Sequence, residues 1–213
     1  MKNYTLYLIR HGITQGNLDG KYIGLTDLPL CDEGFYAITR YAHERLYPAV
    51  QKVYSSPLKR CLETADIIYP DRYVKQIDNI AECDFGEFEG KTQEELKDLP
   101  EYAEWLKGGY EAKAPGGESF GDFTLRCLDG LEEIFKDMMK DQVTKAAVIT
   151  HGGVIMNVTA FSSIARISSV MSSSPSIADE TSSLRFSRLR RYVSRSKSSR
   201  SCWSASAPVA SIR

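Results

Sequence analysis

The sequence lacks the cysteine spacing that would indicate a disulfide framework or a structural zinc site. Its five cysteines are scattered and none forms a CxxC pair: Cys31, Cys61, Cys83, Cys127 and Cys202. An odd, dispersed set is typical of a reducing compartment rather than of a secreted disulfide scaffold. We therefore expect a cytoplasmic protein with free thiols and no metal site built from cysteine.

Long apolar runs are also missing. No stretch approaches the ~18 consecutive apolar residues that a membrane-spanning helix requires, and no apolar signal segment precedes Arg10. The formal net charge of −1 gives no general attraction to polyanions. We expect neither a membrane nor a nucleic-acid partner.

Glycine is absent after Gly153, and the charge balance changes near the same place. Residues 1–157 carry 18 Lys and Arg against 26 Asp and Glu, whereas residues 158–213 carry 9 against 2. The second segment also contains 19 serines and 8 arginines. We therefore divide the chain into one domain over residues 1–157 and an atypical Ser/Arg-rich segment over residues 158–213.

Two interpretations of residues 158–213 stay open. Their bias fits a disordered basic tail; an abrupt change also fits translation of a shifted reading frame, which we favour. We expect no strand or helix there, so that one edge of the sheet would lie uncovered. An Arg/Ser run can bind RNA phosphates, but no folded module or interleaved aromatic residues support that function here.

Short apolar runs alternate with helical patterns in the first 157 residues. Strands are expected at 4–9, 50–54, 73–77 and 146–150, and helices from 32, 56, 92 and about 123. Ser56 and Pro57 resemble a cap with proline in the first turn, and Thr92 opens a capping box for one helix reaching about Leu106. This alternation predicts an α/β fold with a mostly parallel sheet.

Reactive side chains follow the ends of these strands. Arg10 and His11 come at the end of the first strand, and His151 comes directly after the last. Arg60 follows the second by one helical turn, and Glu82 follows the third. Since ligands of parallel sheets bind beyond the carboxyl ends of the strands, we expect these residues to share one site.

These residue types suit phosphoryl transfer. A neutral His11 imidazole can attack phosphorus, and the guanidinium forks of Arg10 and Arg60 match phosphate oxygens. A buried Glu82 with a raised pKa could protonate the leaving oxygen, although Glu87 and Glu89 lie nearby. Asn17, in a glycine-rich turn, could donate an amide hydrogen, and His151, if protonated, would add a donor and a positive charge.

Five segments resemble motifs of the histidine phosphatase superfamily, also called phosphoglycerate mutase-like, and the likeness covers about residues 4–157. They are LIRHGITQGN (8–17), SSPLKRCLETA (55–65), IAECDFGEFEG (80–90), PGGES (115–119) and VITHGG (148–153). The resemblance implies a mostly parallel sheet flanked by helices on both faces, a small cap after the acid segment, and no metal or organic cofactor.

Site roles follow from the same resemblance. His11 would be the phosphohistidine nucleophile, Glu82 the proton donor and His151 the second catalytic histidine. The phosphate pocket would consist of Arg10, Asn17, Arg60 and His151. Two positions depart from the family pattern. Ile13 stands where Glu is common. Cys31 stands where Thr usually opens the next helix, so that Asp32 would supply the cap.

The expected function is hydrolysis of a small soluble phosphomonoester, as in the small bacterial branch that includes α-ribazole-5′-phosphate phosphatases. A 2,3-bisphosphoglycerate-dependent mutase is an alternative, but residues 83–118 contain lysines and no arginine for a second acidic group. An inactive phosphate-binding protein on the same fold is another. The sequence fixes neither the substrate nor the oligomeric state.

Overall fold

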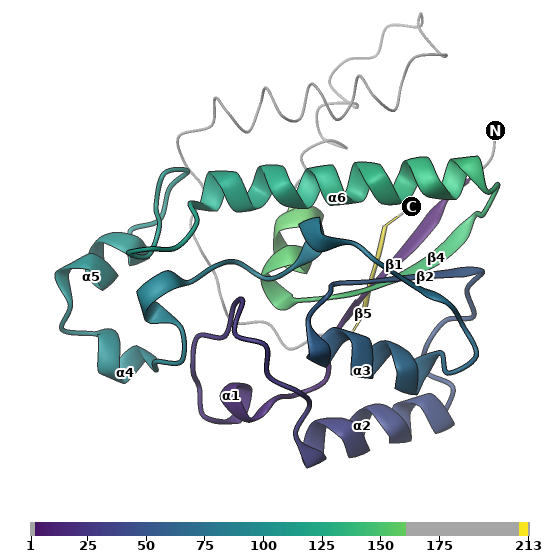
Figure 1. Cartoon of the computed structure of the whole chain (residues 1–213), viewed down its shortest axis with the longest axis horizontal. Helices are drawn as coiled ribbons and strands as arrows, with labels where there is room; N and C mark the ends of the chain where they lie inside the picture. Colours follow the sequence, from purple (N-terminus) through teal and green to yellow (C-terminus); the bar gives the residue numbers. More distant parts are fainter. Residues whose placement is uncertain (1–2, 161–208, 213) are drawn as a thin grey trace, which may run out of the picture.

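The computed structural model describes residues 3–160 and 209–212, in which one five-stranded sheet runs in the order β3-β2-β4-β1-β5 (Figure 1). The strands are β1 (Thr5–Arg10), β2 (Lys52–Ser55), β3 (Val74–Gln76), β4 (Lys145–Thr150) and β5 (Val209–Ile212). The first four pair in parallel, and β5 is antiparallel to β1. The prediction of an α/β fold with a mostly parallel sheet is confirmed.

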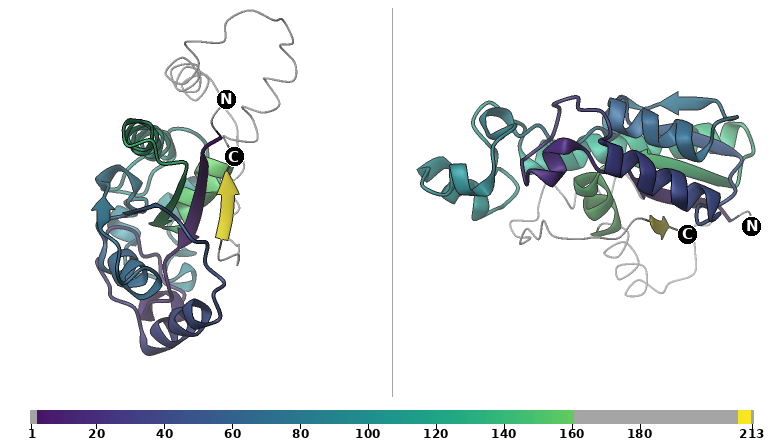
Figure 2. Two further views of the ribbon diagram at one scale, coloured as in Figure 1. Left: turned by 90° about the vertical axis from the view of Figure 1, so that its right-hand side faces the viewer. Right: turned by 90° about the horizontal axis from the view of Figure 1, so that it is seen from below.

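Helices cover both faces of the sheet, with α6 on one side and α2 and α3 on the other (Figure 2). The α-helices are α1 (Gln15–Leu18), α2 (Asp32–His43), α3 (Lys59–Ile68), α4 (Gln93–Leu96), α5 (Pro100–Leu106) and α6 (Phe120–Lys140), followed by a helix over 152–160. Two 3₁₀ turns are η1 (Asp78–Ile80) and η2 (Gly86–Phe88). No helix in these described stretches has the length and apolarity to cross a membrane.

The two faces of the sheet bury separate cores because successive strand side chains point in opposite directions. On β4, Ala146 and Val148 join the core beneath α6, whereas Ala147 and Ile149 join the core beneath α3. This double burial explains why β4 reads as a continuous apolar run. The central strands therefore hold their carboxyl ends at fixed positions.

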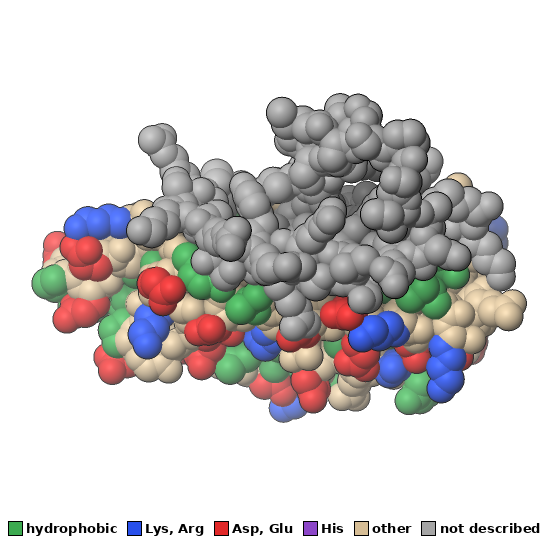
Figure 3. Space-filling model, turned by 90° about the horizontal axis from the view of Figure 1, so that it is seen from above, with side chains coloured by type: hydrophobic (Ala, Val, Ile, Leu, Met, Phe, Trp, Pro, Cys, Tyr) green, Lys and Arg blue, Asp and Glu red, His purple; other side chains and the backbone are tan. Residues whose placement is uncertain are grey.

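Helix α6 is the longest helix in the described residues, and its buried stripe matches the predicted one. Ser119 caps it by accepting a hydrogen bond from the Asp122 amide at 3.0 Å. Seen from above, the visible surface carries acidic and basic side chains interspersed with one another (Figure 3).

The cap after the acid segment contains two short helices, so the prediction of a single helix from Thr92 to Leu106 is wrong. Thr92 and Glu95 do form the predicted capping box, but Pro100 begins α5 at its first turn. Proline has no N–H to continue a preceding helix and disfavours helical backbone in the residue before it.

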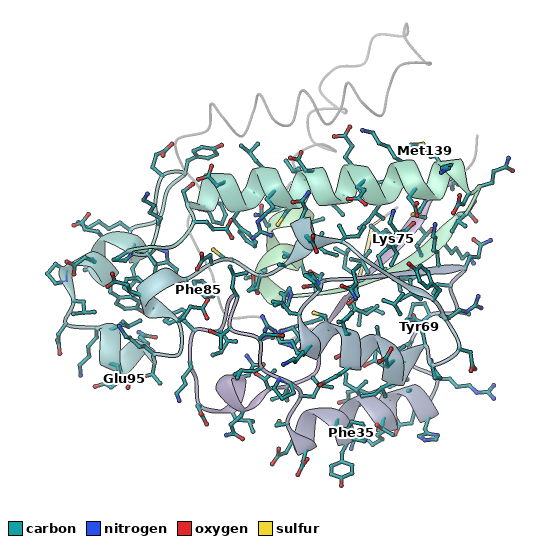
Figure 4. All side chains as sticks on the ribbon, in the orientation of Figure 1. Phe35, Tyr69, Lys75, Phe85, Glu95 and Met139 are labelled. Atoms are coloured by element: carbon teal, nitrogen blue, oxygen red, sulfur yellow. The ribbon has the colours of Figure 1, made fainter. Side chains whose placement is uncertain are left out.

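Aromatic rings fasten this cap to the rest of the domain. Trp105 of α5 lies edge-on to Tyr22, with ring centroids 5.4 Å apart, and to Phe85, at 6.0 Å. Phe85 lies between the α4–α5 lobe and the remaining domain (Figure 4). The hydroxyls of Tyr22 and Tyr102 are 2.7 Å apart. The cap is therefore anchored to two segments next to the expected site.

The expectations of no strand in residues 158–213 and of an uncovered β1 edge are both wrong. Residues 209–212 form β5, which pairs along β1 with Leu6 opposite Ile212 and Ile9 opposite Val209. The helix from 152 also continues through 160, past the expected boundary at 157. Residues 161–208 lie outside the described residues, so the two interpretations of the Ser/Arg-rich segment stay predictions.

Two helix starts differ from expectation. Helix α3 begins at Lys59 with Leu58 in the capping position, while the Ser56 hydroxyl lies 2.7 Å from His151 Nε2 and accepts from the Leu58 amide at 3.4 Å. Helix α2 begins at Asp32 after Cys31, and no side chain caps it. Asp32 is thus a first-turn residue, where its charge favours the helix dipole.

Candidate active site

The carboxyl ends of β1 and β4 bring the two predicted catalytic histidines together. His11 follows β1 directly, and its backbone N–H donates to the Thr150 carbonyl at 3.0 Å. His151 follows β4, and the His11 and His151 ring centroids are 5.1 Å apart at an interplanar angle of 61°. Because β1 and β4 are neighbours in the sheet, two histidines that are 140 positions apart in the sequence lie next to each other.

The surroundings of His11 keep its imidazole neutral. Its Nδ1 lies 2.6 Å from the Gly12 carbonyl, which can only accept, so Nδ1 carries the hydrogen and Nε2 keeps the lone pair. Burial and the positive charges of Arg60 and Arg10 together lower the pKa of His11 to about 3, against the effect of the Gly12 carbonyl. A neutral Nε2 is the form required of a nucleophile.

Arg60 lies in the first turn of α3, and its side chain is buried. The residue is 1% exposed, with Nη1 donating to the Thr26 carbonyl at 2.9 Å and Nη2 donating to the Gly24 carbonyl at 2.7 Å. Within the described part of the chain, its Nε donates to no acceptor. A buried donor of this kind is costly unless an anion satisfies it.

The loop that accepts from Arg60 is held in turn by Glu89. The Glu89 carboxylate accepts from the amides of Gly24 at 3.0 Å and Leu25 at 2.9 Å, and from the Thr26 hydroxyl at 2.6 Å. From the sequence, we considered Glu89 only as a neighbour of Glu82. Its position in the motif at 80–90 was a signal, but its partners 63–65 positions away were not readable.

His151 is fully buried beneath the site. Its Nε2 lies 2.7 Å from the Ser56 hydroxyl, and the Cys61 sulfur lies 3.5 Å from the same nitrogen. Burial holds the pKa of His151 well below its usual range, and His11 and Arg60 reinforce this. The residue missed here is Ser56, whose side chain orients His151 instead of capping α3.

Glu82 is the buried carboxyl group of the site. Its Oε1 accepts from the Cys83 amide at 3.0 Å and its Oε2 accepts from the Gly153 amide, also at 3.0 Å. Burial raises the pKa of Glu82, against the two amides and the charges of Arg60 and Arg10. The Gly153 contact ties Glu82 to the turn that carries His151.

Arg10 and Asn17 complete the predicted set. The Arg10 guanidinium lies next to Gly152, where an added Cβ would be 3.5 Å from Nε, and its charge acts on both histidines and on Glu82. Asn17 lies in α1 rather than in a turn, and its oxygen accepts from the Thr14 amide at 3.1 Å. Only the nitrogen end of the Asn17 carboxamide can therefore donate to a ligand.

The arrangement combines a neutral imidazole, two guanidinium groups and a buried carboxyl group. Among the described residues, no group of three or more His, Cys, Asp or Glu side chains could hold a metal ion. The chemistry that the set itself offers is nucleophilic attack, charge neutralisation on an anion and proton donation.

Comparisons with known proteins identify the family of this chain. Residues 6–166 match the family model of the histidine phosphatase superfamily (branch 1). The chain is 30% identical over 155 residues to the adenosylcobalamin/alpha-ribazole phosphatase of Salmonella typhimurium, covering 70% of this chain and 75% of that protein. It is 27% identical over 165 residues to a 2,3-bisphosphoglycerate-dependent phosphoglycerate mutase of Rhizobium etli, covering 71% and 76%.

A solved structure shows the same likeness. The crystal structure of phosphoserine phosphatase in complex with 3-phosphoglyceric acid from Entamoeba histolytica matches with a TM-score of 0.62 and 33% sequence identity. The match covers 73% of this chain and 78% of that one. The three similar proteins act on different phosphate esters by name, so the likeness leaves the substrate open.

Proposed function

Because the chain belongs to the histidine phosphatase superfamily (branch 1), we propose that it hydrolyses a small phosphomonoester through a phosphohistidine formed on His11. In this proposal Arg10, Asn17, Arg60 and His151 bind the phosphoryl oxygens. Glu82 is the proton donor.

The first step transfers the phosphoryl group to the protein. The lone pair of His11 Nε2 forms a bond to phosphorus while the bond from phosphorus to the ester oxygen breaks. The Glu82 carboxyl group gives its proton to that oxygen, so the leaving group departs as an alcohol. The guanidinium groups of Arg10 and Arg60 neutralise the charge on the remaining oxygens.

The second step returns the protein to its starting state. The Glu82 carboxylate takes a proton from water, and the water oxygen attacks the phosphorus of phosphohistidine. The nitrogen–phosphorus bond breaks, inorganic phosphate leaves, and His11 regains its lone pair. Glu82 is again protonated, so one ester and one water give one alcohol and one phosphate.

A single observation carries the proposal. Two imidazoles with lowered pKa values lie 5.1 Å apart, beside a buried arginine whose Nε donates to no acceptor in the described residues. Neutral imidazoles beside cationic guanidiniums favour a bound dianion that is also open to attack. This supports a phosphate site with a nucleophile at its base.

Trapping of the phosphoprotein tests the nucleophile. Brief incubation with a labelled phosphomonoester and a quench in base should give a phosphorylated protein whose label is lost in acid. We expect His11→Ala to lose the label and to reduce turnover by at least ~10³-fold. His43→Ala, at the end of α2, is the matched control. Full turnover in His11→Ala would overturn the proposal.

For the substrate we propose a small soluble ester, with α-ribazole-5′-phosphate as the first candidate because of the similarity to the Salmonella enzyme. Release of phosphate from α-ribazole-5′-phosphate, phosphoserine and p-nitrophenyl phosphate should rank the esters by kcat/KM. A preference of at least tenfold for one ester would identify its class.

The second candidate is a 2,3-bisphosphoglycerate-dependent mutase, which the similarity to the Rhizobium etli enzyme favours. A mutase has to hold a second acidic group, and residues 83–118 offer lysine but no arginine for this. Interconversion of 3-phosphoglycerate should be compared with hydrolysis of p-nitrophenyl phosphate on one preparation. Dominant interconversion would replace hydrolysis as the function.

A further inference from the structure

The guanidinium group of Arg126 contacts the backbone of the segment that carries Glu82. Arg126 extends from α6, and its Nη1 donates to the carbonyls of Asn79 at 3.2 Å and Ala81 at 3.0 Å. Its Nη2 donates to the carbonyl of Glu82 itself at 3.1 Å. One side chain therefore binds three carbonyl groups in four consecutive residues.

Glu118 completes the arrangement from the PGGES segment. Its carboxylate pairs with Arg126, with Nε donating to Oε2 at 3.2 Å and Nη2 donating to Oε1. The same Oε1 accepts from the Asp84 amide at 2.9 Å, and the Glu118 amide donates to the Asp84 carbonyl at 3.1 Å. The backbone is thus held on both sides of Glu82.

The pair is largely shielded from water, so breaking it would leave a mostly buried charge without its partner. The Arg126 and Glu118 side chains are 24% and 17% exposed, and the guanidinium lies 5.3 Å from the centroid of the Phe123 ring. A planar fork with five N–H donors can serve several carbonyls and a carboxylate at once, whereas an ammonium group cannot reproduce that pattern.

We propose that Arg126 and Glu118 are positioning residues that hold the Glu82 carboxyl group at the leaving oxygen. The hydrogen bonds of Arg126 and Glu118 described above join the two residues to each other and to the backbone around Glu82, while the amides of Cys83 and Gly153 orient its carboxyl group. The charge of Arg126 also contributes to the lowered pKa of His151. The inference rests on the proposed role of Glu82 as proton donor.

The signature of such a role is a dependence on the leaving group. p-Nitrophenolate leaves without being protonated, so the first step with p-nitrophenyl phosphate, which kcat/KM measures, needs little from Glu82. An alkoxide is a poor leaving group and requires the proton. A displaced Glu82 should therefore slow alkyl phosphates selectively, whereas a damaged phosphate pocket would slow both esters alike.

The experiment compares kcat/KM for propyl phosphate and p-nitrophenyl phosphate in Arg126→Met, Arg126→Lys and Glu118→Gln. We expect about a 10- to 100-fold loss with propyl phosphate in Arg126→Met and a loss below about threefold with p-nitrophenyl phosphate. Arg126→Lys and Glu118→Gln should show a smaller selective loss. Lys136→Met removes an exposed pair with Glu132 on the same helix and is the matched control.

Glu82→Gln, measured in parallel, tests the proton-donor role of Glu82 separately from the positioning role of Arg126 and Glu118. If Glu82→Gln slows both esters equally, the proton-donor role fails and the inference falls with it. If Glu82→Gln is selective but Arg126→Lys and Glu118→Gln are not, only the inference is overturned. Turnover of p-nitrophenyl phosphate reports that each variant is folded, so a misfolded Arg126→Met leaves the other two variants to decide.

A double variant gives a further check. Glu82→Gln already removes the proton, so adding Arg126→Lys should cause no further selective loss with propyl phosphate. A second selective loss of the same size would show that Arg126 acts independently of Glu82 and would overturn the inference.

Discussion

His11 must stay unprotonated to attack phosphorus, and its low pKa links catalysis to stability. An unfolded histidine has a pKa near 6.5, whereas folded His11 has a pKa of about 3. Below pH 6.5 the unfolded state therefore binds the additional proton, and the free energy of unfolding falls as pH falls. This contribution is fully present above pH 6.5 and is lost progressively toward pH 3.

We predict that wild-type protein loses about 1.5 kcal/mol more stability than His11→Gln between pH 6.5 and pH 5. Urea unfolding at the two pH values measures the difference, and this range limits the contribution of carboxyl groups. Parallel pH dependence in the two proteins would contradict the assigned environment of His11.

We expect the two glycines after His151 to differ in how well they tolerate substitution by alanine. A Cβ built on Gly153 would lie 2.3 Å from Glu82 Oε1, whereas one on Gly152 would meet its nearest atom, Arg10 Nε, at 3.5 Å. We therefore expect Gly153→Ala to displace the Glu82 carboxyl group and to reduce kcat/KM for propyl phosphate by about tenfold or more. Gly152→Ala should cost far less, and equal losses in kcat/KM would refute this account.

At the level of elements, the loop over residues 24–26 connects Glu89 with Arg60: it donates hydrogen bonds to the Glu89 carboxylate and accepts hydrogen bonds from the Arg60 guanidinium. Glu89→Gln replaces one carboxylate oxygen by an NH₂ group that faces amide donors, so the loop carbonyls should move away from Arg60. We predict an increase in KM of about tenfold for both ester classes, because phosphate binding rather than proton donation is impaired.

Glu87→Gln is the control for that prediction, since Glu87 is an exposed neighbour in η2. Initial rates over a range of ester concentrations separate KM from kcat. An effect of Glu89→Gln on propyl phosphate alone would assign Glu89 to the proton donor instead of the phosphate pocket.

The elements also show how far sequence patterns reach. The four parallel strands were predictable within one or two residues because they include apolar side chains that pack into the cores. The fifth strand, β5, was not predicted, because the Ser/Arg-rich composition of residues 158–213 gave no strand pattern. The cap helices were not, because the capping signal at Thr92 gave a start and the break at Pro100 was given too little weight. Ser56 has the sequence of a cap, but a hydrogen bond to His151, 95 positions away, determines its side chain.

On the scale of the whole molecule, β5 covers the edge of β1 and is itself the last strand of the sheet. Without Val209–Ile212, the backbone N–H and C=O groups of β1 along that edge would lose their partners. We predict that deletion of residues 209–213 lowers the Tm by several degrees and promotes association. Thermal unfolding and light scattering measure both effects, and an unchanged Tm would mean that the β1–β5 pairing contributes little to stability.

The site as a whole was predictable to the extent that its residues adjoin strand ends. His11, Arg10 and His151 follow from that rule, since the sheet must bring its carboxyl ends together. Arg126 and the role of Glu118 could not be inferred, because their partners depend on how α6 packs against η1. Reactive groups are thus readable from local sequence, whereas the groups that hold them in place depend on tertiary packing.

The pairing of Leu6 with Ile212 has a practical consequence for engineering. Leu6 and Ile212 lie opposite each other near the amino end of β1, and five residues of strand, roughly 16 Å, separate Leu6 from His11. A short peptide could link the chain before Leu6 to the chain after Ile212, and new ends could be opened in the exposed turn near residue 142. A circularly permuted enzyme of this kind would keep an immobilisation tag or fluorophore away from incoming ester.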